Sequence, residues 1–502
     1  DNSKMHIASA ALLSQAAIVS SLASPRALVR LPQPTRCALP ALCAGASASG
    51  IQTEAVAGEL TQAPCQGVAA LPARAVHGVQ AARSHAAIRH DNVALSQGHG
   101  SCTTPAWLET LTEWNERGAG SVMLILATAI SLTLANTAAT SSGWLGLWMT
   151  KLGPNIGGHA LSLRGWINEG LMAIFFFLVG LEIKQELRCG SLASLRTAAL
   201  PCIAAVGGMI TPMAVYLLVQ KLLPIGSMLG LTIPMATDIA FAMAVYGFFR
   251  KRMPPSSSAF LLTLATVDDL GAILVLATCF ASGLAPTFLA AAAAIVGAMA
   301  AAGLKGVNDM KLFAAGGVGL WWCLLRAGVN ADVAGVVAAL CVSTRAKVRT
   351  AGGELESVSL RAISRLEPLS AFVIMPLFAL ANTAVQFGAS TAGAAATAAA
   401  SAAVALGIGA GLLLGKPLGI FGFTWLAAKS GLCRMPAGMS NDHLAIVGLL
   451  GGIGFTMCLL LTEVALPAPM QALPKLMVLG SSLLASVGAA VAMRKQPVLK
   501  GA

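Results

Sequence analysis

The chain has 502 residues, of which 56% are hydrophobic and only 10% are charged. Ordinary soluble domains carry about 25% charged residues, so this chain has too few charges to cover a water-facing surface. The composition excludes a soluble enzyme, a fibrous protein and a disordered protein. It predicts an all-α polytopic membrane protein, in which small residues such as the 52 glycines let helices pack closely.

The formal net charge is +12. A basic protein can bind nucleic acid. Here, however, the lysines and arginines lie in short loops between apolar segments, as in the cytoplasmic loops of membrane proteins. We therefore expect no nucleic-acid partner. The cysteines form no CxxC pairs and have no histidines at ligand spacing, so we expect neither a disulfide framework nor a zinc site.

The N-terminal region, residues 1–115, differs from the rest of the chain. It is rich in Ala, Ser, Gln, Pro and Gly, poor in acids, and contains no apolar run long enough to span a bilayer. This low-complexity extension has the composition of an organelle transit peptide, which indicates a plastid or mitochondrial membrane. A disordered tail fits the composition equally, and the rest of the chain would also suit a plasma membrane or bacterial inner membrane.

Residues 116–495 form the predicted transmembrane domain, followed by a short tail, 496–502. Apolar segments near the length that crosses a hydrocarbon core of ~30 Å recur along this region. About twelve transmembrane helices are predicted, at residues 119–138, 168–188, 197–220, 229–249, 258–282, 285–304, 310–326, 329–343, 366–386, 399–414, 443–465 and 476–494. One set of alternate loops carries most of the lysines and arginines, which places both ends of this domain in the cytoplasm or its organellar equivalent.

Four charged residues stand out in apolar surroundings: Asp238, Asp268 and Asp269 inside predicted segments, and Lys416 in a stretch that continues the tenth segment. A charge at the bilayer centre costs at least about 2.5–3.5 kcal/mol, so such residues are functional candidates. On a helix, Asp268 and Asp269 project about 100° apart. Their oxygens can hold protons or, when ionised, a small hard cation, and a site that holds one or the other is the minimum for antiport. The alternative is a structural ion-pair network that orients helices.

Two segments are interrupted by helix-breaking residues. Segment 229–249 contains Gly230 and Pro234 before Thr237 and Asp238, and segment 443–465 contains several glycines before Phe455. Paired interruptions of this kind indicate inverted repeats with two discontinuous helices around a midplane site. Opposed helix ends carry partial charges that an Asp and a Lys would compensate. Ordinary small-residue packing is the alternative explanation for the glycines.

Several motifs, in matching order and spacing, carry a resemblance to a known family. They are residues 175–184 (FFFLVGLEIK), 236–242 (ATDIAFA), 267–272 (VDDLGA), 415–419 (GKPLG) and 452–457 (GIGFTM). Together they resemble the NhaA family of sodium/proton antiporters along essentially all of residues 116–495. The resemblance implies a transporter, not an enzyme, that exchanges Na⁺ or Li⁺ for H⁺ by alternating access. The exchange would be electrogenic and pH-regulated, and no cofactor is expected.

The resemblance also implies roles for individual residues. Asp269 would be the main carrier of cation and proton, with Asp268 beside it. Lys416 would compensate helix dipoles and pair with Asp268, while Asp238 and Thr237 would lie at the first helix break.

Other implied roles lie outside the ion site. Glu182 would serve ion entry and the response to pH, and Glu367 would belong to the pH-sensing region. A homodimer would form through the loop at 140–166, within membrane lipid. Three residues depart from well-studied relatives and leave the pH profile open: Gln185 replaces a basic residue, Asn330 a histidine and Glu169 an aspartate.

Two other classes of protein also use carboxylates or broken helices in a membrane. An intramembrane aspartic protease expects its aspartates in YD and GxGD contexts, which neither Asp238 nor the Asp268–Asp269 pair has, and it has no role for a buried Lys416. A cation channel would suit interrupted helices, but a twin carboxylate that binds protons suits coupled exchange better.

Overall fold

The computed structural model describes most of the chain after residue 117. The described residues are 111–112, 118–153, 161–223, 227–281, 284–307, 309–343, 347–349, 355–387 and 395–498. The N-terminal extension predicted for residues 1–115 therefore lies outside the described residues, apart from 111–112.

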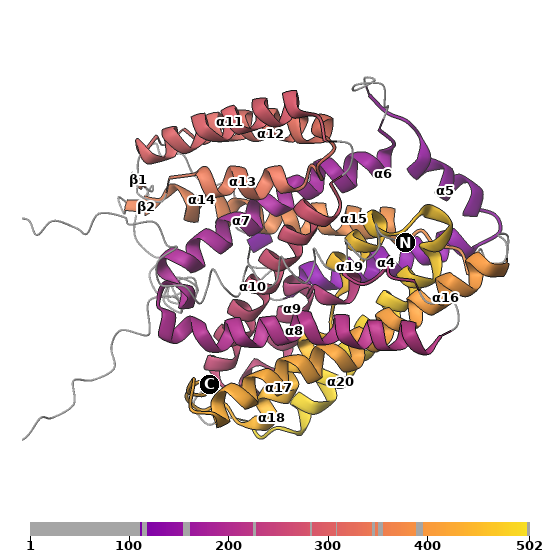
Figure 1. The fold of residues 1–502 in the computed structure, drawn as a ribbon, viewed down its shortest axis with the longest axis vertical. Helices are drawn as coiled ribbons and strands as arrows, with labels where there is room; N and C mark the ends of the chain where they lie inside the picture. Colours follow the sequence, from indigo (N-terminus) through magenta and orange to yellow (C-terminus); the bar gives the residue numbers. More distant parts are fainter. Residues whose placement is uncertain are drawn as a thin grey trace, which may run out of the picture. The chain divides into compact units, whose positions relative to one another are not determined.

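Helices make up nearly all of the described part (Figure 1). The α-helices are α4 (Ala119–Asn136), α5 (Ser141–Met149), α6 (Leu163–Gly165), α7 (Met172–Cys189), α8 (Leu195–Leu222), α9 (Ile239–Phe248), α10 (Pro255–Cys279), α11 (Pro286–Leu304), α12 (Met310–Ala327), α13 (Val333–Cys341), α14 (Val358–Leu369), α15 (Met375–Asn382), α16 (Ala395–Ala410), α17 (Lys416–Lys429), α18 (Asn441–Gly451), α19 (Phe455–Ala465) and α20 (Ala472–Lys495).

Short helical turns of other types connect or interrupt these helices. The π-helical turns are η2 (Trp166–Leu171), η6 (Ser370–Ile374) and η8 (Gly411–Gly415). The 3₁₀ turns are η3 (Ser191–Ala193), η4 (Ile233–Met235), η5 (Arg250–Arg252) and η9 (Ala468–Met470). Turns η6 and η8 are each followed within two residues by a proline, Pro376 and Pro417. Because proline has no N–H group, it frees a carbonyl of the preceding turn and favours a local widening of the helix.

A two-stranded antiparallel hairpin, which the sequence analysis did not predict, precedes α14. Strand β1 (Lys347–Arg349) pairs with strand β2 (Leu355–Ser357), with Lys347 opposite Ser357 and Arg349 opposite Leu355. The hairpin lies in one of the strongly basic loops and leaves the rest of the described fold helical.

Eight helices in the described part are long and apolar enough to cross a membrane, or up to nine if α18 and α19, bent by 41° at their break, form one span. Helix is present in each of the twelve predicted segments. However, α13 has nine residues and covers only about 14 Å at 1.5 Å per residue. The described helices thus give an all-α polytopic membrane protein, while the number twelve stays a prediction.

The helices pack as two groups. In one group α8 runs alongside α17 (Figure 1). Helices α10 and α16 pack on α8, α18 packs on α17, and α20 packs on α16 and α18. In the other group α7 packs on α13, and α11 lies beside α12 (Figure 1). The α8–α17 contact depends on small residues, because a methyl group on Gly207 or Gly419 would collide with the carbonyl oxygen of the other.

The outer surface of several helices is apolar. Only 11% of the membrane-length apolar stretch of α11 is buried inside the protein. Helix α4 likewise exposes Ile125, Leu126 and Ile130. Water would penalise such surfaces, whereas lipid tails are as apolar as the side chains themselves. The fold is therefore that of an integral, multi-pass membrane protein.

Candidate functional site

Two interrupted helical segments meet inside the protein. After turn η4 the chain is extended at Ala236 and Asp238, before α9 begins, and residues 452–454 separate α18 from α19. The Asp238 N–H donates to the Ile453 carbonyl at 2.7 Å, and the Thr237 hydroxyl donates to the Gly451 carbonyl at 2.9 Å. Backbone groups that each break leaves unpaired are thus satisfied by the other break, as a membrane interior requires.

The Asp238 carboxylate caps two helices at this crossing. Its Oδ1 accepts from the Phe241 N–H at 3.0 Å, in the first turn of α9. Its Oδ2 accepts from the N–H and the hydroxyl of Thr456, at 3.1 and 2.5 Å, in the first turn of α19. One buried negative charge therefore faces the partly positive N-termini of both helices.

Lys416 supplies the opposite charge. Its side chain is fully buried, and its ammonium donates to Asp268 Oδ2 at 2.5 Å. It also donates to the carbonyl of Met235, the last residue of turn η4. A cation at that position stabilises the partly negative end of the turn. Lys416 lies within the continuous helical segment 396–429, as predicted from the sequence.

The two adjacent aspartates lie in the middle of α10 and differ in their partners. Asp268 is 1% exposed and paired with Lys416, while Asp269 is 2% exposed. Asp269 Oδ1 is buried and has no hydrogen-bond partner in the described part of the chain. Asp238 and Glu182 are close enough to Asp269 to interact with it electrostatically. Asp268 Oδ1 is also buried without a hydrogen-bond partner in the described residues, so the site contains one carboxylate paired with a cation, one without such a pair, and a free acceptor oxygen on each. Such oxygens fit a hard cation or a proton.

The five residues predicted for the ion site lie in one cluster: Asp238, Thr237, Asp268, Asp269 and Lys416. The two residues predicted for entry and pH sensing lie elsewhere. Glu182 is partly buried on α7, and Glu367 is partly buried on α14. No group of three or more His, Cys, Asp or Glu side chains in the described residues could hold a metal ion. A cation at this cluster would therefore depend on the two carboxylates and on neighbouring oxygens.

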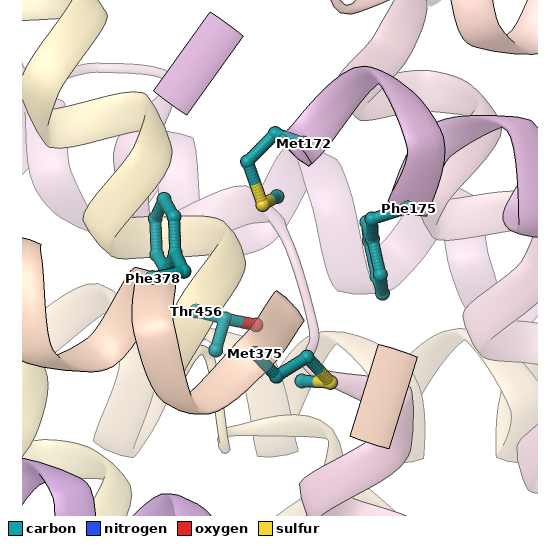
Figure 2. A pocket seen from close by; sticks show the side chains of 5 residues that line it. All are labelled: Met172, Phe175, Met375, Phe378 and Thr456. Atoms are coloured by element: carbon teal, nitrogen blue, oxygen red, sulfur yellow. The ribbon is translucent and has the colours of Figure 1, made fainter. Parts of the chain in front are cut away.

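A narrow pocket with essentially no room for a water molecule adjoins this crossing (Figure 2). Figure 2 shows its lining side chains, which come from α7, α15 and α19: Met172, Phe175, Met375, Phe378 and Thr456. All except the threonine are apolar. The same Thr456 hydroxyl donates to the Asp238 carboxylate, so the pocket reaches the edge of the capped helix ends.

Two features of the buried polar structure were not predicted from the sequence. Thr456 lies in the motif at 452–457, and a hydroxyl directly after a glycine-rich break is a usable signal for a role at that break. Glu463 is a carboxylate inside predicted segment 443–465. Glu463 accepts from Lys475 at 2.6 Å and is paired with Arg164, which ties α6 to the end of α19 and the start of α20.

The helical fold defines a polytopic membrane protein with a buried cluster of charged side chains at a crossing of two interrupted segments. Residues 113–493 match the family model described as Na⁺/H⁺ antiporter 1. The chain is also 39% identical over 349 residues to proteins named Na(+)/H(+) antiporter NhaA from Shigella dysenteriae serotype 1, Shigella flexneri and Escherichia coli strain K12. Each alignment covers 69% of this chain and 87% of the relative. The chain therefore belongs to the NhaA family of sodium/proton antiporters, which confirms the resemblance seen in its motifs.

Proposed function

We propose that this protein exchanges Na⁺ or Li⁺ for H⁺ across a membrane, at the carboxylates of Asp268 and Asp269. The observation that carries the proposal is the unequal environment of the two acids. Asp268 forms an ion pair with Lys416 through Oδ2, whereas Asp269 forms none in the described part of the chain, and the Oδ1 atoms of both are buried without a hydrogen-bond partner. An unpaired carboxylate in a low-dielectric interior binds a proton or a cation to avoid a large desolvation cost.

Coupling follows from competition for the same oxygens. When Asp269 and Asp268 are protonated the site is closed to Na⁺, and Na⁺ binding requires the protons to leave. Because one Na⁺ is held by two ionised carboxylates, more protons than Na⁺ ions move in each cycle, and the exchange is electrogenic. Neighbouring oxygens, such as the Thr237 hydroxyl, lie at the same crossing.

Alternating access would move the two helix groups relative to each other. Both carboxylates are buried, so ions reach them only when the groups separate on one side. Asp268 and Lys416 belong to elements of the α8–α17 group, whereas Glu182 lies on α7 of the other group. Motion between the groups would therefore change the distance between Glu182 and the site.

This arrangement supports pH regulation through Glu182 and Glu367. The charge of Glu182 acts on Asp269, so protonation of Glu182 would alter cation affinity at the site. Gln185 and Asn330 stand where relatives carry ionisable residues, so we expect a pH-activation profile different from theirs. The Asn330 side chain instead accepts a hydrogen bond from the Asp332 N–H at 2.9 Å.

Two further proposals concern the setting of the protein. The extension at 1–115 would direct the chain to a plastid or mitochondrial membrane, with a plasma membrane or bacterial inner membrane as the alternative. Homodimers would form in the lipid bilayer through the loop at 140–166. That loop contains α5 and a bridge between Lys151 and Ser162, while residues 154–160 lie outside the described residues.

The exchange proposal can be tested in everted membrane vesicles that contain a pH-sensitive dye. Addition of NaCl or LiCl to respiring vesicles is expected to dequench the dye, and a membrane potential is expected to change the rate. Absence of dequenching between pH 6.5 and 9 would refute Na⁺/H⁺ exchange. Sodium current in proteoliposomes without proton movement would identify a channel instead.

A further inference from the structure

A second pair of carboxylates, of which Asp332 is buried and Glu169 partly buried, lies outside the Asp268–Asp269 site. Glu169 is in turn η2, which leads directly into α7, and Asp332 immediately precedes α13. Neither residue belongs to the ion cluster described above. Each has a buried side-chain oxygen, Glu169 Oε2 and Asp332 Oδ1, without a hydrogen-bond partner in the described part of the chain.

The packing of α7 on α13 brings these two residues to the same level. A methyl group on Gly335 would collide with the Ala173 carbonyl, and one on Gly180 would press on the Val336 backbone. The two contacts follow the same order along both helices, so α7 and α13 run parallel with their backbones close together. One turn before Gly335 is Asp332, and one turn before Ala173 is Glu169.

Within the described part of the chain, no cation forms an ion pair with either of these carboxylates. The Trp321 indole donates to the Glu169 backbone carbonyl at 2.7 Å, and its ring stacks on Trp166 with centroids 6.0 Å apart. Asp332 occupies the N-cap position of α13, but its carboxylate makes no capping hydrogen bond. Arg326, the cation near the end of α12, lies over the Phe288 ring at 5.0 Å instead of pairing with either acid.

Burial makes this arrangement unfavourable unless something binds to it. Asp332 is 2% exposed, and Glu169 is close enough to act on it electrostatically. Two like charges in a low-dielectric interior are too costly to remain unpaired, so the pair must hold a proton or a cation. Oxygens from two carboxylates are the ligands that small hard cations prefer.

We propose that Glu169 and Asp332 form a second site for Na⁺, near the non-cytoplasmic end of α7 and α13, where a shared proton replaces the ion. The opposite end of α7 carries Lys184 and Arg188 of a strongly basic loop, which places Glu169 on the non-cytoplasmic side. Thirteen residues separate Glu169 from Glu182, or about 20 Å of helix. A role of this site in transport depends on the proposed exchange. Its ability to bind Na⁺ does not.

Binding of ²²Na⁺ to the purified full-length chain at pH 8.5 tests this proposal directly. We expect saturable binding to persist in the Asp268→Asn/Asp269→Asn variant, because the second site is intact. Adding Asp332→Asn should weaken that binding by about tenfold or more, since one of the two charges is lost. Asp332→Glu should retain it, and Asp309→Asn, at the start of α12, serves as a matched control.

A second measurement covers the case in which the combined variants do not fold. With the native ion site present, saturation is expected at two Na⁺ per chain, and Asp332→Asn or Glu169→Gln should each reduce this to one. A stoichiometry of one Na⁺ per unaltered chain would overturn the second site. Na⁺ binding that is unchanged by Asp332→Asn would overturn it as well. Loss of exchange with two Na⁺ still bound would instead count against the proposed transport function alone.

Discussion

The ammonium of Lys416 lies 2.5 Å from the Asp268 carboxylate at a point where neither side chain reaches the protein surface. The two residues are on different helices, α17 and α10, and the same ammonium also holds the end of turn η4. Each charge therefore makes the burial of the other tolerable. Removal of one partner should cost more than removal of both.

We predict that, in thermal unfolding in detergent, a single substitution of this pair destabilises the protein more than the double substitution does. Lys416→Met leaves the Asp268 charge buried and unpaired, so it should destabilise the protein by about 3–5 kcal/mol. The double variant Lys416→Met/Asp268→Asn should recover a large part of that loss. Strictly additive losses in the double-mutant cycle would contradict direct pairing.

Because Asp238 caps two helices, we predict that its substitution destabilises the protein more than the loss of a single cap does. Asp238→Ala removes acceptors from the first turns of α9 and α19, and each lost cap is worth about 0.5–2 kcal/mol. Asp238→Asn keeps one acceptor oxygen and should lose less. Asp309→Ala, which removes a single cap at Lys311, is the control. Equal shifts in melting temperature for Asp238→Ala and Asp309→Ala would argue against the double cap.

Two glycines in α17 provide a matched test of the α8–α17 packing. Gly419→Ala would place a methyl group against the Gly207 carbonyl and should destabilise the protein. At Gly422 a methyl group would meet no atom within 4 Å, so Gly422→Ala should be neutral or stabilising by up to about 1 kcal/mol. The melting temperature should therefore fall for Gly419→Ala and stay equal or rise for Gly422→Ala, and equal shifts for the two variants would refute the packing.

Glu463, Arg164 and Lys475 form a cluster in which the loss of Glu463 should destabilise the protein more than the loss of Arg164. Glu463→Gln removes the carboxylate that both Arg164 and Lys475 contact, so both cations lose this ion pair. Arg164→Met leaves Glu463 paired with Lys475. We expect the melting temperature to fall further for Glu463→Gln than for Arg164→Met. The opposite order would show that Arg164, and not Glu463, organises this cluster.

The ion cluster could be predicted largely from the sequence. Asp238, Asp268, Asp269 and Lys416 interrupt apolar segments, and the cost of such charges makes them stand out without any knowledge of the fold. The interrupted segments were likewise visible as glycines and prolines within otherwise hydrophobic runs.

Contacts between distant segments could not be predicted in this way. Thr456 lies 218 positions from Asp238, and Glu463 lies 299 positions from Arg164, so no local pattern joins them. Span lengths were also hard to place, because breaks and π-helical turns divide apolar runs that look uniform. Which of two neighbouring acids has a partner depends on the rotation of α10 and on the position of Lys416, and both emerge only from packing.

The most direct test of the central claim is Na⁺-dependent proton release in everted vesicles that contain the Asp269→Asn variant. The change removes the charge and keeps the shape, so the protein should insert normally but show no dequenching at any NaCl concentration. Asp442→Asn, at an exposed position at the start of α18, should exchange as the unaltered chain does. Normal dequenching by Asp269→Asn would contradict the account.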